Sequence, residues 1–153
     1  MRNSRLREQA RLISAECLAV RIRLLNRIIT NIYDAAMRPH GISLNQASIL
    51  TLIMSVGDVG YGDIGRILHM EKSTVSRNIE RMRNNGWIEA AGKGDKGVTV
   101  LSITVSGERV LKKAHIAWAK AQDEAAQYLG QDGVAAVMQL GEKFWPEGEI
   151  QEE

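Results

Sequence analysis

The amino-acid sequence predicts a mainly α-helical fold with one small β-hairpin, which places it in the α+β class. Three observations support this prediction. Long stretches carry apolar residues at helical spacing, and only two prolines occur, Pro39 and Pro146. One segment, residues 87–104, changes instead to the alternating pattern of β-strands around a glycine-rich tip.

The composition is that of a soluble globular protein. Of the 153 residues, 44% are hydrophobic and 25% are charged, with a formal net charge of +2. The single cysteine, Cys17, cannot form an internal disulfide, and the chain has neither a leader nor an apolar run of about 18 residues. We therefore expect a cytoplasmic protein that does not bind a membrane.

The first 40 residues are rich in arginine, whereas the last ten are acidic. This asymmetry indicates either an anionic partner near the N-terminal region or an arginine stripe that keeps a helix soluble.

Residues 6–37 contain no proline or glycine, so we expect one continuous helix of roughly thirty residues. Two apolar stripes run along it. The first stripe is Leu6, Ala10, Ile13, Cys17, Val20 and Leu24, and the second is Leu18, Ile22, Leu25, Ile29, Ile32 and Ala36. This face is wider than one small domain normally covers, which predicts a dimerisation helix. The segment Arg38-Pro39-His40-Gly41 should end it.

Two shorter helices should follow, because apolar residues recur at helical spacing after Ser43 and again over residues 62–68. Ser43 is a suitable N-cap for the first of them, and Gly57 should end it. Residues 69–72 then lead to a third helix. The helix over residues 62–68 and the helix that follows residue 72 have the arrangement of a helix-turn-helix. The segment that links them lacks the usual glycine.

The third helix, residues 73–85, organises the rest of the chain. Ser73 is a candidate N-cap, and Gly86 is the residue type that ends helices in a left-handed conformation. Its inner stripe should be Val75, Ile79 and Met82, and its outer face should carry Thr74, Arg77, Asn78 and Arg81. Arginine pairs with guanine edges and asparagine with adenine edges, so this face suits the DNA major groove. An ordinary solvated helix has the same pattern.

A β-hairpin follows, with residues 87–89 and 98–104 on either side of the tip. A helix-turn-helix followed by such a hairpin is a winged helix. Lys93 and Lys96 of the tip can reach phosphates and add affinity that depends on salt. The Gly92-x-Gly94-x-x-Gly97 spacing is followed by a strand, which argues against a nucleotide-binding loop.

Two helices close the chain. Ser106 should cap the first, residues 108–129, which Gly130 ends, and Asp132 should cap the second, residues 134–145. We expect residues 1–38 and 107–145 to form a helical dimerisation region. Residues 39–106 should form the winged helix-turn-helix DNA-binding domain, and residues 146–153 an acidic tail.

The chain resembles the MarR family of bacterial transcription regulators over almost its whole length. The resemblance is carried by Arg38-Pro39-His40-Gly41-Ile42-Ser43, Ser73-Thr74-Val75-Ser76-Arg77, Asn85-Gly86-Trp87-Ile88 and Leu101-x-Ile103-Thr104-x-x-Gly107. It implies a homodimer that binds double-stranded DNA at a palindromic operator and usually represses transcription. It also implies release from DNA when a small, often phenolic, effector enters a pocket between the dimerisation and DNA-binding regions.

The residues that we assign to DNA contact lie on the reading helix, the helix start at Ser43 and the wing. They are Ser43, Ser73, Thr74, Ser76, Arg77, Asn78, Arg81, Lys93 and Lys96. Family wings commonly carry arginine where this sequence has Gly94-Asp95-Lys96-Gly97. Lysine lacks the planar fork of arginine, so the wing should contribute less to readout of the groove.

The residues on elements that could line the effector pocket are Tyr33, Met37, His40, Met54 and Trp118. A simple core role is the alternative for all five. Peroxide-sensing members of the family carry a reactive cysteine early in the first helix. Cys17 lies in that region, but its place on an apolar stripe favours a buried, inert thiol.

Catalytic, metal and cofactor sites are not expected. His40, His69 and His115 have no partner at metal-ligand spacing, and no nucleophile, carboxylate pair or phosphate loop forms a catalytic motif. We therefore expect a regulator and not an enzyme. The alternative function is a winged helix that binds an acidic protein surface through Arg77 and Arg81, and the salt dependence of DNA binding distinguishes the two.

Overall fold

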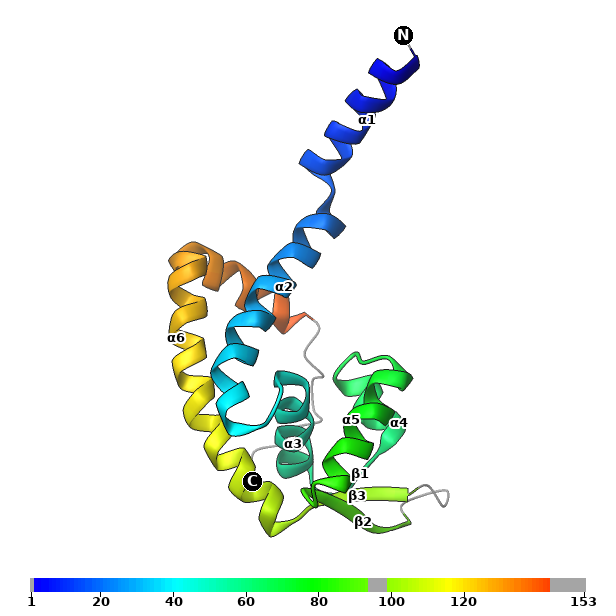
Figure 1. Cartoon of the computed structure of the whole chain (residues 1–153), viewed down its shortest axis with the longest axis vertical. Coiled ribbons are helices and arrows are strands. Elements are labelled where there is room, and N and C mark those ends of the chain that lie inside the picture. The colour runs from blue at the N-terminus through cyan, green and yellow to red at the C-terminus, as the bar shows by residue number, and fades with distance from the viewer. Residues whose placement is uncertain (1, 94–98, 144–153) are drawn as a thin grey trace.

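The structure, a computed structural model, describes residues 2–93 and 99–143 and is mostly helical with a small antiparallel sheet (Figure 1). This confirms the predicted fold class. In chain order the elements are α1 (Arg2–Glu16), α2 (Leu18–Met37), the 3-10 helix η1 (Arg38–His40), α3 (Leu44–Val56), β1 (Val59–Gly60), α4 (Tyr61–Ile67), α5 (Lys72–Asn84), β2 (Ile88–Lys93), β3 (Thr99–Ile103) and α6 (Val105–Glu142).

The sheet has the strand order β1-β3-β2, and both pairs are antiparallel. The predicted hairpin is β2 and β3, with Ile88 opposite Ile103 and an irregularity between Ala90 and Gly92. The third strand, β1, was not predicted, because two residues are too short to show an alternating pattern. The tip, with Lys96, lies outside the described residues, as does the acidic tail.

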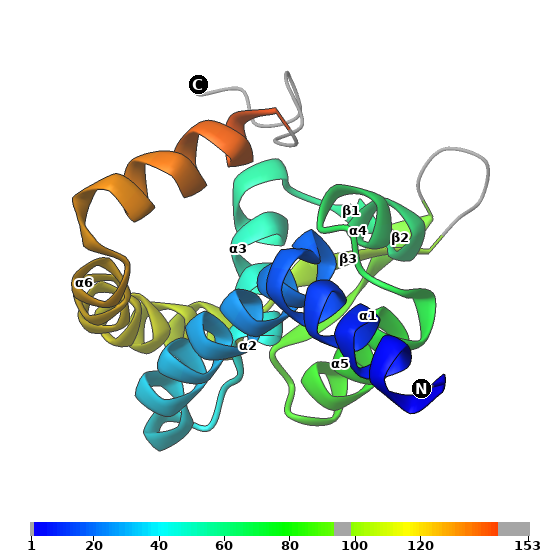
Figure 2. The ribbon, with the colours of Figure 1, turned by 90° about the horizontal axis from the view of Figure 1, so that it is seen from above.

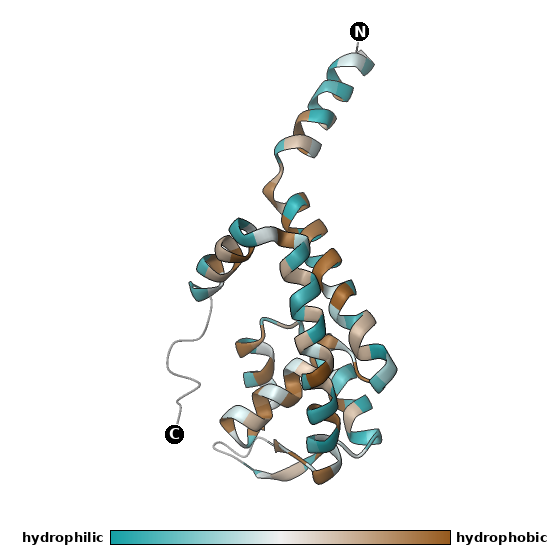
Figure 3. Cartoon of the chain, turned by 90° about the vertical axis from the view of Figure 1, so that its left-hand side faces the viewer, coloured by the Kyte–Doolittle hydropathy of each residue, from teal (hydrophilic) through white to brown (hydrophobic). Residues whose placement is uncertain are grey.

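The prediction of one continuous N-terminal helix is wrong. Cys17 has extended backbone angles, φ −69° and ψ 111°, and separates α1 from α2. The Arg21 guanidinium donates a hydrogen bond to the Ala15 carbonyl across this break. Because α1 projects from the body of the protein (Figures 1 and 3), no tertiary packing holds the helix straight at this point.

The helix caps agree with the prediction at one of three serines. Ser43 caps α3, with its Oγ accepting from the Gln46 backbone N–H at 3.3 Å and its own N–H donating to Gln46 Oε1 at 3.0 Å. Ser73 is not an N-cap, because α5 starts one residue earlier, after Glu71. Ser106 is not one either, because Thr104 caps α6.

Gly130 divides α6 into two segments, as predicted, because its backbone angles, φ 69° and ψ 170°, are not helical. Figure 2 shows the final segment leading away from the first at a wide angle. Asp132 lies inside the second segment and does not cap it.

The core lies where α3, α4, α5 and the sheet meet. Its fully buried side chains are Met37, Ile49, Leu50, Ile53, Ile64, Ile79, Met82 and Leu101. α2 and α6 pack against each other beside this core, and α6 also contacts α3. Apolar residues also occur along the outer helices (Figure 3). No helix in the described ranges is long and apolar enough to cross a membrane.

The junction between the wing and α6 is tightly packed. Thr104 Oγ1 donates to the Gly86 carbonyl at 2.6 Å and accepts from the Gly107 N–H at 3.1 Å. A Cβ atom at Gly107 would lie 2.1 Å from the Trp87 carbonyl oxygen and 2.7 Å from Ile103 Cγ1. Only glycine therefore fits where α6 crosses the start of β2.

Replacing Gly107 with alanine should destabilise the protein, because the methyl group must displace backbone. We expect a loss of about 1–3 kcal/mol in the free energy of unfolding, measured by urea denaturation. The matched control is Gly62→Ala in α4, where a Cβ atom meets nothing within 4 Å. The control should gain roughly 0.5–1 kcal/mol from helix propensity, and an equal loss in both variants would contradict the packing argument.

Candidate nucleic-acid interface

The turn between α4 and α5 sets the position of the reading helix, α5. His69 has a positive φ of 49° and stands where this kind of turn usually has glycine. The Met70 N–H donates to the Gly65 carbonyl at 2.9 Å, which ties the end of the turn back to α4. The turn that lacks a glycine in the sequence is therefore made with a left-handed histidine.

α5 is amphipathic in the way that its sequence predicts. Val75, Ile79 and Met82 are 2%, 1% and 0% exposed, so one stripe of the helix is sealed against the core. Arg77 and Arg81 are exposed on the other side. Gly86 has a φ of 68°, and the helix ends just before it, at Asn84.

The polar side chains predicted to face DNA are not equivalent. Thr74 and Asn78 are half-buried, and Asn78 Nδ2 donates to the Thr74 carbonyl at 2.9 Å. Arg77 is exposed and folds along the helix, with Nε donating to the Ser73 carbonyl at 3.1 Å and Nη2 contacting Thr74 Oγ1 at 3.4 Å. The accessible face is therefore centred on Arg77 and not on Asn78.

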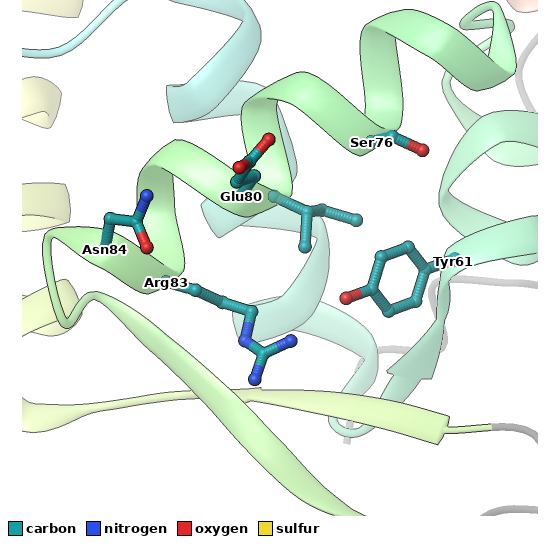
Figure 4. A pocket seen from close by; sticks show the side chains of 6 residues that line it. Tyr61, Ser76, Glu80, Arg83 and Asn84 are labelled. Carbon is teal, nitrogen blue, oxygen red and sulfur yellow. The ribbon is translucent and has the colours of Figure 1, made fainter.

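The opposite flank of α5 forms a polar hollow that the sequence reasoning missed. The hollow has a volume of about 420 Å³. Its lining residues are Tyr61, Ser76, Ile79, Glu80, Arg83 and Asn84. Figure 4 shows the Tyr61 hydroxyl and the Arg83 side chain extending into the same space. Ser76, Glu80 and Arg83 recur at helical spacing, which places them on one face of α5. This face lies next to the one that we predicted to contact DNA.

The remaining predicted DNA contacts lie at helix starts and on the wing. Ser43 is half-buried, and because its oxygen accepts from Gln46, its hydroxyl hydrogen stays available to a phosphate. Ser73 and Ser76 are exposed in the first turns of α5. Lys93 is exposed at the end of β2.

A second site is a groove of about 1040 Å³, with α3 on one wall and α6 on the other. Met37, Met54 and Trp118, three of the five predicted effector residues, line it. Tyr33 and His40 are not among the lining residues. His40 is exposed in η1, and the Tyr33 hydroxyl donates to Gln122 Oε1, which joins α2 to α6.

The groove is mostly apolar, with the hydroxyl groups of Ser48, Thr51 and Ser55 on α3 and charged side chains on α6. Arg109, Lys112 and His115 contribute polar groups there, and the His115 ring stacks on Trp118 with centroids 5.7 Å apart and an interplanar angle of 12°. The sequence did not predict these three residues as part of the groove, because only the apolar side of this helix was assigned a role.

Cys17 is half-buried at the break between α1 and α2, which corrects the expectation of a buried thiol. The three histidines lie on different elements. Among the described residues, no group of three or more His, Cys, Asp or Glu side chains could hold a metal ion.

The profile of the MarR family matches residues 40–96. The HTH-type transcriptional regulator YwoH of Bacillus subtilis is 26% identical over 98 residues, which cover 64% of this chain and 72% of YwoH.

Two solved structures share the fold. A mutant of MarR from E. coli in complex with operator DNA superposes with a TM-score of 0.75 at 18% identity, covering 88% of this chain and 97% of that one. The transcriptional repressor CouR bound to p-coumaroyl-CoA has a TM-score of 0.74 at 16% identity, covering 88% and 96%.

Tyr33 gives a testable link between α2 and α6. At neutral pH the Tyr33 phenol is protonated and donates to Gln122, and burial raises its pKa above the ordinary value of 10.0. Tyr33→Phe should cost about 0.5–1.5 kcal/mol at pH 7. Above pH 10.0 the unfolded chain loses this proton before the folded one does, so wild-type stability should fall with pH relative to the variant.

The measurement is urea denaturation of both proteins from pH 7 to about pH 11. Tyr128→Phe, which removes the hydroxyl of an exposed tyrosine on α6, is the control for the loss of a phenol. A gap between wild type and Tyr33→Phe that stays constant with pH would refute the role of burial.

Proposed function

We propose that this chain is a winged helix-turn-helix transcription regulator of the MarR family that binds a palindromic operator as a homodimer, as the profile match and the similarity to YwoH support. We further propose that it represses transcription there and releases the DNA when a small effector occupies the groove between α3 and α6. The observation that carries the proposal is the orientation of α5. Its apolar stripe is sealed inside, so Arg77 and Arg81 face outward.

Arg77 is the principal base reader in this proposal. It is exposed and central on α5, and a guanidinium can donate two hydrogen bonds to the O6 and N7 atoms of guanine. Arg81, one helical turn further on, reaches a base or a nearby phosphate. Asn78 adds to readout from the flank, because its amide oxygen remains available after Nδ2 donates to Thr74.

Phosphate contacts come from the surroundings of α5. Ser73 and Ser76 lie near its N-terminus, where the helix dipole favours anions. Ser43 and Lys93 extend the contact on either side. These groups position the helix in the groove and carry no sequence information of their own.

The dimer rests on apolar side chains that one copy of the chain leaves exposed on the terminal helices. They include Leu18, Ile22 and Leu24 of α2 and Ile116, Val137, Met138 and Leu140 of α6. So many large apolar side chains in solvent on the terminal helices favour a protein partner. We assign residues 1–38 and 107–145 to this dimerisation region and residues 39–106 to DNA binding. Two copies of α5 would then lie about one DNA turn apart, roughly 34–36 Å.

The effector proposal follows from the position of the groove. α3 belongs to the winged unit and α6 to the dimerisation region, so a molecule between them contacts both. It lowers DNA affinity if it prefers a spacing of the two reading helices that does not fit the operator. The α6 wall carries Arg109 and Lys112 against Glu108, a surplus of positive charge beside apolar side chains that suits an aromatic carboxylate. CouR, which has the same fold, binds an aromatic CoA ester.

Arg77→Ala should weaken operator binding by about 1–3 kcal/mol and relax the preference at one position of each half-site. Lys93→Ala should instead weaken binding to every sequence. Because one phosphate contact is lost, the slope of the logarithm of the binding constant against the logarithm of salt concentration should fall by about one. The measurement is gel-shift titration, at several salt concentrations, of duplexes selected from a random pool.

Arg5→Ala, on α1 far from the reading helix in Figure 1, is the control for the loss of one positive charge. An Arg77→Ala protein that selects the same operator with equal strength would exclude Arg77 as a reader. Binding that is insensitive to salt would favour the protein-interaction alternative instead.

The groove is tested with adjacent lysines of α6. Lys112 lines the groove, whereas Lys113 is exposed next to it and does not. With hydroxybenzoate as the probe, Lys112→Ala should weaken binding about tenfold, which corresponds to about 1.4 kcal/mol, and Lys113→Ala should not. Binding is followed by the change in tryptophan fluorescence that Trp118 of the groove contributes, with Trp118→Phe as the reference, and by release of the operator duplex. Equal effects of the two substitutions would place the ligand elsewhere.

A further inference from the structure

The N-terminal arm, which we define as residues 6–24, carries an apolar seam that the described residues of the same chain leave largely exposed. The seam residues follow the alternating spacing of four and three that defines a coiled coil. They are Leu6, Ala10, Ile13, Cys17, Val20 and Leu24. Leu6, Ile13 and Leu24 are 57%, 61% and 54% exposed. The spacing of four and three continues in the sequence across Cys17, where the backbone of the single chain is extended.

The seam is distinct from the surface with which α2 packs on its own chain. Leu25, Ile29 and Ile32 belong to the other apolar stripe and are half-buried, on the helix that packs against α6. Figures 1 and 3 show α1 continuing beyond this contact, roughly in line with α2 and away from the body. The arm therefore presents its seam to solvent.

A helix in this position needs a partner. α1 has 15 residues, and isolated helices of about 12–15 residues are marginal in water. Its large apolar side chains, Leu6, Leu12 and Ile13, are 57%, 56% and 61% exposed. In a coiled coil, each apolar side chain of one helix inserts between side chains of a facing helix that has the same heptad spacing. A second copy of this chain supplies such a helix.

We propose that the arms of two copies pair in parallel as a two-stranded coiled coil, with Cys17 of one chain facing Cys17 of the other. The inference rests on the proposed function for its orientation. α1 points away from the part of the molecule that holds the hairpin and α5 (Figure 1). If both winged units contact one duplex, both arms project from the opposite side of the dimer, where only a parallel pair can form.

The charges beside the seam favour the same orientation. In a parallel pair, Glu16 flanks the seam opposite Arg21 of the second copy, an attractive pair at the positions that set partner choice. An antiparallel pair of the same seam would bring Glu16 close to its own equivalent and Arg7 close to Arg21. In the single chain, Arg21 bonds instead to the Ala15 carbonyl at the break. Pairing would free this arginine for Glu16.

The position of the cysteine makes the arrangement testable in the full-length protein. Cys17 is the only cysteine in the sequence, so a short bis-maleimide can join two chains only through it. We expect a covalent dimer, and none with Cys17→Ser. In the Cys17→Ser background, Ile13→Cys on the seam should restore cross-linking. Ala15→Cys, which lies on the outer side of the coil, should not.

Operator binding and sedimentation mass of the same proteins separate this inference from the proposed function. A dimer that binds its operator but does not cross-link at positions 13 and 17 would overturn the coiled coil and leave the function standing. Equal cross-linking at positions 13 and 15 would also overturn it. A monomer that does not bind DNA would overturn both proposals.

Discussion

Val75, Ile79 and Met82 on one side of α5 are almost completely removed from solvent, and the rest of the interface depends on this burial. Each such side chain contributes about 1.5–3 kcal/mol when buried, so rotating the helix to expose them is costly. The stripe therefore determines which side chains face outward. Arg77 and Arg81 are on that side, whereas Thr74 and Asn78 lie at its edge. A shift in the packing of these three side chains would therefore also turn the side of α5 that carries Arg77 and Arg81.

The junction around Gly107 joins this reading unit to the terminal helices. α6 starts against the Trp87 carbonyl and is capped by Thr104, which is bonded to Gly86 directly after α5. The end of the reading helix and the start of α6 are thus held by the same few atoms. The groove between α3 and α6 lies along the same helix. A molecule bound there would contact an element that is held to the end of α5 by the hydrogen bonds of Thr104 and that belongs to the proposed dimerisation region at its other end.

A single chain leaves a large amount of apolar surface exposed to solvent. The winged unit has its own buried core, but the arm and the outer faces of α2 and α6 leave large apolar side chains in solvent. The proposed pairing with a second copy would cover these faces and place two reading helices on one side. Folding of the arm and recognition of a two-fold operator would then depend on the same association.

The sequence by itself predicted the elements whose signal is local. The stripe of α5, the Ser43 cap, the left-handed Gly86 and the division at Gly130 all follow from spacing or from one residue type. Tertiary contacts decided the rest. Thr104 and not Ser106 caps α6 because its hydroxyl also reaches the Gly86 carbonyl, 18 residues away. β1 exists only because β3 pairs with it, and the groove and the hollow at Tyr61 form between segments that the sequence does not show as neighbours. Local spacing cannot encode such contacts, because they depend on where distant backbone atoms meet.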